Sequence, residues 1–325
     1  MKFRPDHPFH ILTEEQFETQ FQDIIRQLEP CRTEGYYQGF DGKELFYEYF
    51  QAENSRGAVV ILHGLSEFTK KYHEFAYYLL QQGLDVFLYD QRCHGRSCRL
   101  TDRQDMIHVD KFADYEADLH CFVETVVRPA TEGKPLYLYA HSMGGAVAAL
   151  YLAEHPQVFR KAVLSAPMIE PLTGSVSPGF ARRGLGLYLL VKDRKGKFWS
   201  CNEFDPNYKF ERAQDKSYAR FCRNMQIRID QPCYRTTPYT LGWVHESLKL
   251  RPKLTRSRFL RKIRTPILML SAERDGVVST AAQQEFAQKC PACRQVVQMG
   301  ASHTMLNGRL ETITEHVQLV LNHFC

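Results

Sequence analysis

The chain alternates between short apolar runs and longer stretches in which apolar residues recur every three or four positions. The short runs are rich in aliphatic and aromatic residues and are typical of strands buried inside a parallel sheet. They lie at residues 58–64, 84–90, 136–140, 161–167, 265–275 and 294–299. The longer stretches predict helices at 67–82, 110–127 and 281–289, directly after the strand at 136–140, and at the end of the chain up to residue 324. A hairpin turning at Asp41-Gly42 is expected ahead of the first buried strand.

Strands that alternate with helices predict an α/β fold with a mostly parallel, doubly wound sheet. The alternation stops after Pro167 and resumes at Thr265, and the residues between are helical or irregular, with many prolines and charges. We therefore expect residues 1–166 and 263–325 to form the core domain. Residues 167–262 are expected to form a mainly helical lid inserted late in the sheet.

The segment LYLYAHSMGGAVAALYLAEHP, residues 136–156, changes from strand to helix at Ser142. A serine on so tight a turn has a strained backbone and a hydroxyl that points out of the bend, which is the geometry of a nucleophile elbow. Gly144 and Gly145 supply the small residues that let strand and helix approach each other. Ala140 stands where the motif G-x-S-x-G has its first glycine, so the match to the motif is incomplete.

Groups that would activate Ser142 follow two later strands. Active groups gather at the carboxyl ends of strands in such sheets, and Asp275 and His303 both stand there. The order serine, aspartate, histidine is the one expected of an α/β-hydrolase triad. In this hypothesis His303 removes the proton from Ser142 and Asp275 holds the imidazole. Glu273 lies on the same loop as Asp275 and is an alternative acid.

A serine nucleophile also needs hydrogen-bond donors for the oxyanion that develops on the substrate. Leu65 follows the LHG turn beside the predicted elbow, and Met143 follows the nucleophile directly. Their backbone amides are the candidate oxyanion donors. Glu67 and Tyr72, just past this turn, either touch a polar substrate head or serve the helix start and the packing.

Four motifs together resemble one serine-hydrolase family. The stretches ILHGLSEFTKKYHEFAYYLLQQGLDVFLYDQRCHGRS, AHSMGGA, AERDGVVS and GASHTML, in this order, resemble the α/β-hydrolase family of bacterial lysophospholipase L2 and the monoacylglycerol lipases. The resemblance covers the chain from about residue 35 to its end, and residues 234–248 resemble the lysophospholipase L2 branch. It implies an α/β-hydrolase with a mostly helical lid that cleaves the ester of a single-chain lipid without a cofactor. The triad positions of the family fall on Ser142, Asp275 and His303, and the oxyanion positions on Leu65 and Met143.

Composition is that of a soluble globular protein, with 325 residues, 44% of them hydrophobic and 24% charged. The opening MKFRPDHPFH lacks the apolar core of a signal peptide, and the longest uncharged apolar stretch is too short to span a bilayer. A cytoplasmic location is therefore expected, with the ten cysteines as reduced thiols. Cys290 and Cys293 form a C-x-x-C pair, but no second pair completes a zinc site, so no metal is expected.

Positive charge is concentrated in the inserted segment. Residues 167–262 contain 20 Lys plus Arg against eight Asp plus Glu, a net charge of +12, while the rest of the chain carries −7. Such a segment favours substrates with a phosphate, or transient contact with an anionic membrane at the inner membrane surface. Solvated helix faces are the alternative explanation. No nucleic-acid-binding motif accompanies the charge. Protein partners cannot be identified from the sequence.

Three functional hypotheses remain open. The first is a carboxylic-ester hydrolase that acts on lysophospholipids through an acyl-enzyme, with monoacylglycerol lipase or general carboxylesterase activity as the alternative. The second is an aminopeptidase of the same fold, because the acyl-enzyme chemistry is shared. The third is a non-catalytic lipid binder that kept the fold. The complete set of triad residues favours the first hypothesis over the third.

Overall fold

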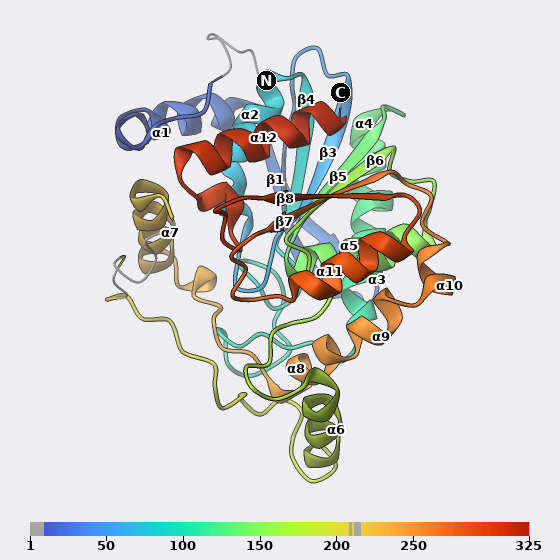
Figure 1. Ribbon diagram of the computed structural model, residues 1–325. Helices are drawn as coiled ribbons and strands as arrows, with labels where there is room; N and C mark the ends of the chain where they lie inside the picture. The colour runs from blue at the N-terminus through green and yellow to red at the C-terminus, as the bar shows by residue number, and fades with distance from the viewer. Residues whose placement is uncertain (1–9, 208–209, 211–215, 325) are drawn as a thin grey trace.

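The structure is a computed structural model that describes residues 10–207, 210 and 216–324, and one mixed sheet lies at its centre (Figure 1). Its strands are β1 (Arg32–Gln38), β2 (Glu44–Phe50), β3 (Gly57–Leu62), β4 (Leu84–Tyr89), β5 (Leu136–His141), β6 (Lys161–Ser165), β7 (Ile267–Ala272) and β8 (Cys293–Gln298). They are ordered β1-β2-β4-β3-β5-β6-β7-β8. The β1–β2 and β2–β4 pairs are antiparallel and the other pairs are parallel. The expected doubly wound, mostly parallel sheet is confirmed.

Helices cover both faces of this sheet (Figure 1). One face carries α1 (Glu14–Leu28), α2 (His73–Gln81) and α12 (Leu310–Phe324), and the other carries α3 (Ala113–Phe122), α5 (Met143–Glu154) and α11 (Thr280–Lys289). The central strand β3 has apolar side chains on both faces of the sheet, so both faces are packed against helices. Val60 points into the cluster beneath α3 and α5, whereas Val59 and Ile61 point into the cluster beneath α2 and α12. Because side chains alternate between the faces, an uninterrupted apolar strand is buried on both.

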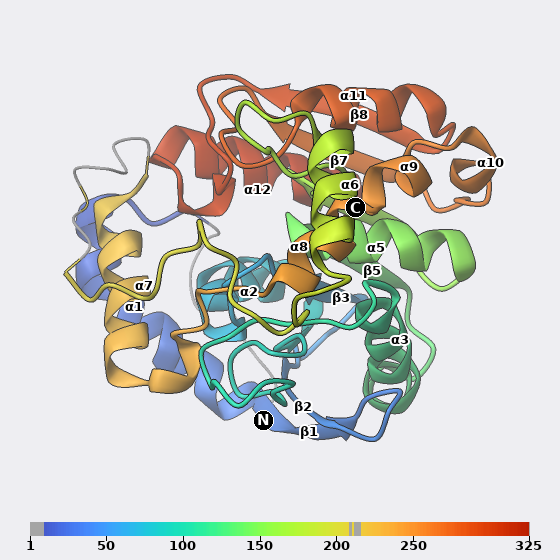
Figure 2. The same cartoon turned by 90° about the horizontal axis from the view of Figure 1, so that it is seen from below.

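The segment between β6 and β7 holds five α-helices and, in the described part of the chain, none of the eight strands. These helices are α6 (Pro178–Tyr188), α7 (Tyr218–Asp230), α8 (Leu241–Leu248), α9 (Leu250–Leu254) and α10 (Ser257–Leu260). Seen from below, α6 and α8 lie over the end of the molecule where β3 and β5 lead into their loops (Figure 2). Leu254 and Leu260, from α9 and α10, belong to the core cluster beneath α5 and α11. The inserted segment is thus anchored in the core near its carboxyl end.

Two helices differ from what the sequence pattern predicted. Helix α1 was not predicted, although Thr13 and Gln16 form a capping box at its start, which is a recognisable sequence signal. The predicted helix at 110–127 begins at Ala113 and passes through a π-helical turn at 123–127. It continues as a short helix, α4 (Arg128–Thr131), in which Pro129 occupies the first turn.

Candidate active site

A single residue, Ser142, separates strand β5 from helix α5. Its backbone has φ 52° and ψ −116°, a combination that a non-glycine residue rarely adopts. A Cβ on Gly144 would lie 2.6 Å from the carbonyl oxygen of Leu62, and a Cβ on Gly145 would lie 2.6 Å from Cβ of Pro167. Both glycines are therefore required by the close approach of α5 to the neighbouring strands. The local geometry is that of the strained strand-to-helix turn expected from the sequence.

The ring of His303 lies between Ser142 and Asp275, and it contacts both. Its Nε2 is 2.8 Å from Oγ of Ser142, and its Nδ1 is 2.8 Å from Oδ2 of Asp275. The second carboxylate oxygen of Asp275 accepts hydrogen bonds from the backbone N–H groups of Val277 and Val278, at 2.9 and 3.0 Å. The structure thus brings the three residues together, although Ser142 and Asp275 are more than 130 positions apart in the sequence.

The charge state of Asp275 fixes the tautomer of His303. Burial raises the pKa of the Asp275 carboxyl, but the hydrogen bond from His303 and those from the two valine amides outweigh burial and hold the pKa below its ordinary value. An ionised carboxylate only accepts hydrogen bonds, so Nδ1 of His303 carries the proton. The Nε2 atom then has a free lone pair directed at the hydroxyl of Ser142. This arrangement is the one in which an imidazole can accept the serine proton.

Two neighbouring groups are placed differently. Glu273, the alternative acid, is exposed, and its Oε2 accepts the backbone N–H of Gly300 at 2.7 Å rather than a bond from His303. His141 lies beside the triad, with its ring centroid 5.0 Å from that of His303. Burial lowers the pKa of His141 to about 4, so this ring is neutral at pH 7. Its Nδ1 donates to the carbonyl oxygen of Ser165 at 3.1 Å, which ties it to β6.

The loop after β3 approaches the nucleophile closely. A Cβ added to Gly64 would lie 3.1 Å from Cβ of Ser142, and Ser66 has a positive φ of 59°. Within the described residues, the backbone N–H groups of Leu65 and Met143 have no hydrogen-bond acceptor. Two free amides beside a serine hydroxyl are what an oxyanion site requires.

Glu67 holds this loop in place, a role that the sequence pattern left open. Its side chain is buried, and its Oε2 accepts the N–H of Gly64 at 2.6 Å and the hydroxyl of Tyr72 at 2.6 Å. Lys71 forms an ion pair with the other oxygen. Burial raises the pKa of the carboxyl, but the charge of Lys71 and the hydrogen bonds hold it well below its ordinary value. Glu67 and Tyr72 therefore face the loop from within, rather than a substrate head.

In the part of the chain that the structure describes, no group of three or more His, Cys, Asp or Glu side chains is placed to hold a metal ion. Cys290 and Cys293 lie on a turn in which the N–H of Cys293 donates to the carbonyl oxygen of Cys290, at 3.0 Å. Among the described helices, none combines the length and apolar character needed to cross a membrane.

Comparison with known proteins places this geometry in context. The model of the family described as serine aminopeptidase, S33, matches residues 53–309. Lysophospholipase L2 of Escherichia coli K12 is 31% identical over 290 residues, which cover 85% of this chain and 82% of that protein. Monoglyceride lipase of Saccharomyces cerevisiae is 24% identical over 85% of this chain and 87% of that protein. The crystal structure of a soluble variant of that yeast lipase with a substrate analogue superposes with a TM-score of 0.69, at 19% identity and over 88% of this chain and 92% of that one.

Proposed function

The chain belongs to the serine aminopeptidase S33 family of α/β-hydrolases and is a carboxylic-ester hydrolase, and from this premise we propose that it cleaves the acyl ester of single-chain lipids with Ser142 as its nucleophile. Lysophospholipids are the proposed substrates. The observation that carries the proposal is the position of His303, whose two ring nitrogens lie 2.8 Å from Ser142 Oγ and from Asp275 Oδ2. A neutral imidazole between a hydroxyl and a carboxylate is the unit that makes serine nucleophilic.

The proposed reaction has two halves. Ser142 Oγ attacks the ester carbonyl carbon while His303 Nε2 takes the hydroxyl proton, and Asp275 stabilises the imidazolium that forms. The amides of Leu65 and Met143 donate to the carbonyl oxygen as it becomes negative. His303 then gives its proton to the alcohol, and the alcohol departs. The acyl group stays bound to Ser142. A water molecule, deprotonated by His303, attacks the acyl-enzyme carbonyl carbon. The bond between this carbon and Ser142 Oγ then breaks, His303 returns the proton to Oγ, and the fatty acid is released.

The preference for a phosphate-bearing lipid rests on the inserted segment and on the relatives. The triad and the two amides meet only the ester, which lysophospholipids and monoacylglycerols share, so discrimination has to come from groups that reach the head. The inserted segment supplies a net charge of +12. The relative named lysophospholipase L2, at 31% identity, supports the same choice.

A substrate panel with one acyl chain tests this choice. We expect kcat/KM for lysophosphatidylethanolamine and lysophosphatidylcholine to exceed that for monoacylglycerol by about tenfold or more, because a hydrogen bond to a charged group contributes about 1.5–3 kcal/mol. Aminoacyl nitroanilides should be cleaved far more slowly than any of the esters. A higher kcat/KM for monoacylglycerol would select the monoacylglycerol alternative, and faster cleavage of the anilides would select the peptidase.

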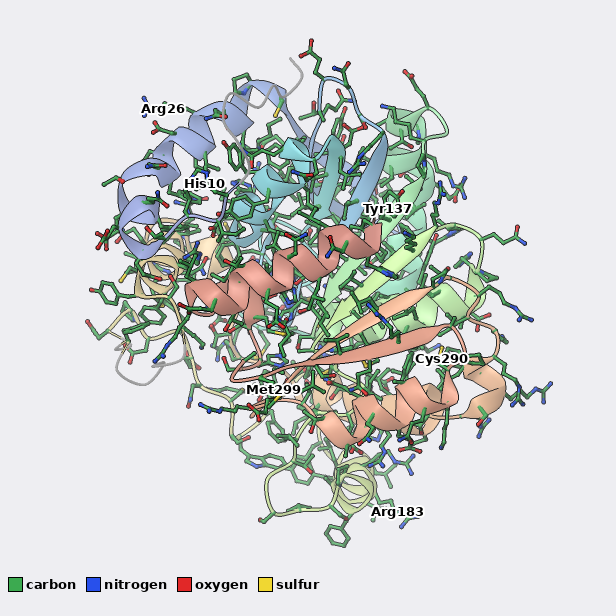
Figure 3. All side chains as sticks on the ribbon, turned by 45° about the horizontal axis from the view of Figure 1, so that its top comes forward. His10, Arg26, Tyr137, Arg183, Cys290 and Met299 are labelled. Carbon is green, nitrogen blue, oxygen red and sulfur yellow. The ribbon has the colours of Figure 1, made fainter. Side chains whose placement is uncertain are left out.

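We further propose that α6 brings the protein to an anionic membrane surface. Phe180 and Leu187 of α6, and Val191 in the turn that follows it, are 71%, 69% and 80% exposed. Among the described residues, Arg182 and Arg183 form no ion pair, and Arg183 lies on the outer side of α6 (Figure 3). Exposed apolar side chains next to unpaired arginines suit the boundary between anionic head groups and acyl chains.

The membrane proposal predicts a selective loss on mutation. Phe180→Ser combined with Leu187→Ser should reduce co-sedimentation with vesicles containing phosphatidylglycerol by about tenfold or more, since each change removes one inserted apolar side chain. Met299→Ser is the matched control, because Met299 is 70% exposed but lies after β8, outside the inserted segment. Hydrolysis of nitrophenyl butyrate should be unchanged in all variants. Equal loss of vesicle binding in the Met299 variant would contradict a docking role for α6.

A further inference from the structure

Three arginines of α7 point to different partners. Arg220 donates from Nε to the carboxylate of Glu74 at 2.8 Å, so its charge is compensated. Arg223 stacks on the ring of Phe21, with 3.7 Å between the guanidinium carbon and the ring centroid. Arg228 donates to the carbonyl oxygen of Ser66 and, within the described residues, to no carboxylate. Two of the three arginines thus serve the attachment of α7, and the third retains unused donors.

Arg228 lines a cavity whose wall includes sequence neighbours of two proposed active-site residues. The cavity has a volume of about 870 Å³, and its wall includes Phe68, three residues after Leu65 in the loop that follows β3, and Thr304, the neighbour of His303. Arg228 itself lies above the ring of Phe68, 5.6 Å from its centroid. The hydrogen bond from Arg228 to Ser66 connects the same wall to the loop after β3, which also holds Leu65. A substrate head that leaves the ester at Ser142 therefore has this cavity beside it.

Among the described residues, the guanidinium of Arg228 is paired with no carboxylate, so its charge is available to an anion in the cavity. Lys71 also lines the wall, but its ammonium is paired with the buried carboxylate of Glu67. Burial lowers the pKa of Arg228, while the more distant charge of Glu67 raises it, and the net shift is downward. Such a shift reflects a guanidinium that has lost water without gaining a counter-ion. A phosphate would supply that counter-ion and match the planar donor array of the side chain.

The wall of the same cavity also carries a negative charge. Asp205 lines it and is exposed, and its Oδ1 accepts the backbone N–H of Asn207 at 2.8 Å. Among the described residues, Asp205 has no cationic partner. Its neighbour Glu203 differs, because it is paired with Arg103 and Lys197. Within the described part of the chain, the wall therefore carries an arginine without a carboxylate partner and a carboxylate without a cationic partner.

We propose that this cavity is a subsite for a zwitterionic phospholipid head group, with the phosphate on Arg228 and the ammonium group at Asp205. The inference rests on the proposed function, and it names the substrate class within it: lysophospholipids with an ethanolamine or choline head. The phosphate is assigned to Arg228 because this residue bonds to Ser66, next to Leu65, and in the lipid the phosphate lies nearer the ester than the amine does. Anionic lysolipids without an amine use Arg228 alone.

Calorimetric titration with soluble, acyl-free head groups tests the subsite without any ester cleavage. Wild-type protein should bind glycerophosphoethanolamine more tightly than glycerophosphoglycerol, a phosphodiester without an amine. Arg228→Gln should weaken both by about tenfold or more, because it removes the charged donor. Asp205→Asn should weaken glycerophosphoethanolamine severalfold and leave glycerophosphoglycerol unchanged. Arg223→Gln is the matched control on the same helix and should change neither affinity.

Three results would overturn the subsite. They are the absence of glycerophosphoethanolamine binding by the wild type, equal affinity of the wild type for the two compounds, and an effect of Arg228→Gln no larger than that of Arg223→Gln. A purely structural role for Arg228, through its bond to Ser66, would lower kcat/KM for lysophosphatidylethanolamine and monoacylglycerol by the same factor. The subsite requires the larger loss on the phospholipid. If the wild type binds the head group but cleaves no lysophospholipid, the proposed function fails and the subsite stands.

Discussion

Replacement of Ser142 by alanine should lower kcat/KM for nitrophenyl butyrate by about 10⁴-fold or more, and replacement of His303 by alanine should do the same. The two residues act in one proton transfer, since Nε2 of His303 lies 2.8 Å from Ser142 Oγ. Removal of either leaves the other without a function, so the double variant should be no worse than the single ones. Steady-state kinetics on the three variants measure this directly.

Thermal unfolding distinguishes lost chemistry from lost structure. Each variant should melt close to the wild type, because Ser142→Ala deletes one oxygen and His303 is partly exposed at the mouth of the site. Additive losses in the double variant would mean that the two residues act separately. Turnover by folded Ser142→Ala protein within about tenfold of the wild type would place the nucleophile elsewhere.

The second large effect is expected at Asp275. Asparagine at this position would turn its amide toward Nδ1 of His303 and favour the tautomer in which Nε2 carries the proton. That tautomer cannot accept the proton of Ser142, so kcat should fall by about 10⁴-fold at pH 7. Glu273→Gln is the matched control on the same loop. Glu273 binds the N–H of Gly300 instead of His303, so this variant should retain activity within about tenfold of the wild type.

The same two variants also decide whether Asp275 or Glu273 is the acid that holds His303. A greater loss in Glu273→Gln than in Asp275→Asn, measured as kcat on the same ester, would show that the acid has been assigned to the wrong residue.

Because the pKa of Asp275 is depressed in the folded protein, its contribution to folding stability depends on pH. Its contribution to folding stability is fully present above the unfolded carboxyl pKa of about 3.9 and is lost as the pH falls through its lower folded value. Near pH 7 the carboxylate is therefore ionised throughout the assays.

Local patterns predicted the sheet because each strand carries its own signal. Strand β3 is buried on both faces, and its unbroken apolar run shows this without knowledge of its neighbours. The turn at Ser142 was likewise visible in sequence, from the small residues Gly144 and Gly145. Ala140 weakened that motif, yet it lies in β5 between Leu62 and Leu164 and is fully buried, so the sheet accommodates its methyl group.

Contacts between distant segments could not be predicted in the same way. Glu67 holds the loop after β3 by accepting the hydroxyl of Tyr72 and the N–H of Gly64, and nothing in its spacing distinguishes that role from a helix-start charge. The difference between Arg223 and Arg228 is equally invisible in sequence. It depends on Phe21 in α1 and on Ser66 after β3, which only the fold brings to α7. Helix α1 differs from these cases, because its capping box is a local signal that marks the helix start in the sequence itself.

The central claim is that Ser142 is the residue that carries the acyl group. Treatment of the wild-type protein with a fluorophosphonate, followed by peptide mass spectrometry, tests it most directly, because only an activated serine reacts at a stoichiometric level. We expect one adduct per chain, located on Ser142, and loss of ester hydrolysis in proportion to the labelling. An adduct on another residue that abolishes activity, or full ester hydrolysis by protein fully labelled on Ser142, would contradict the account.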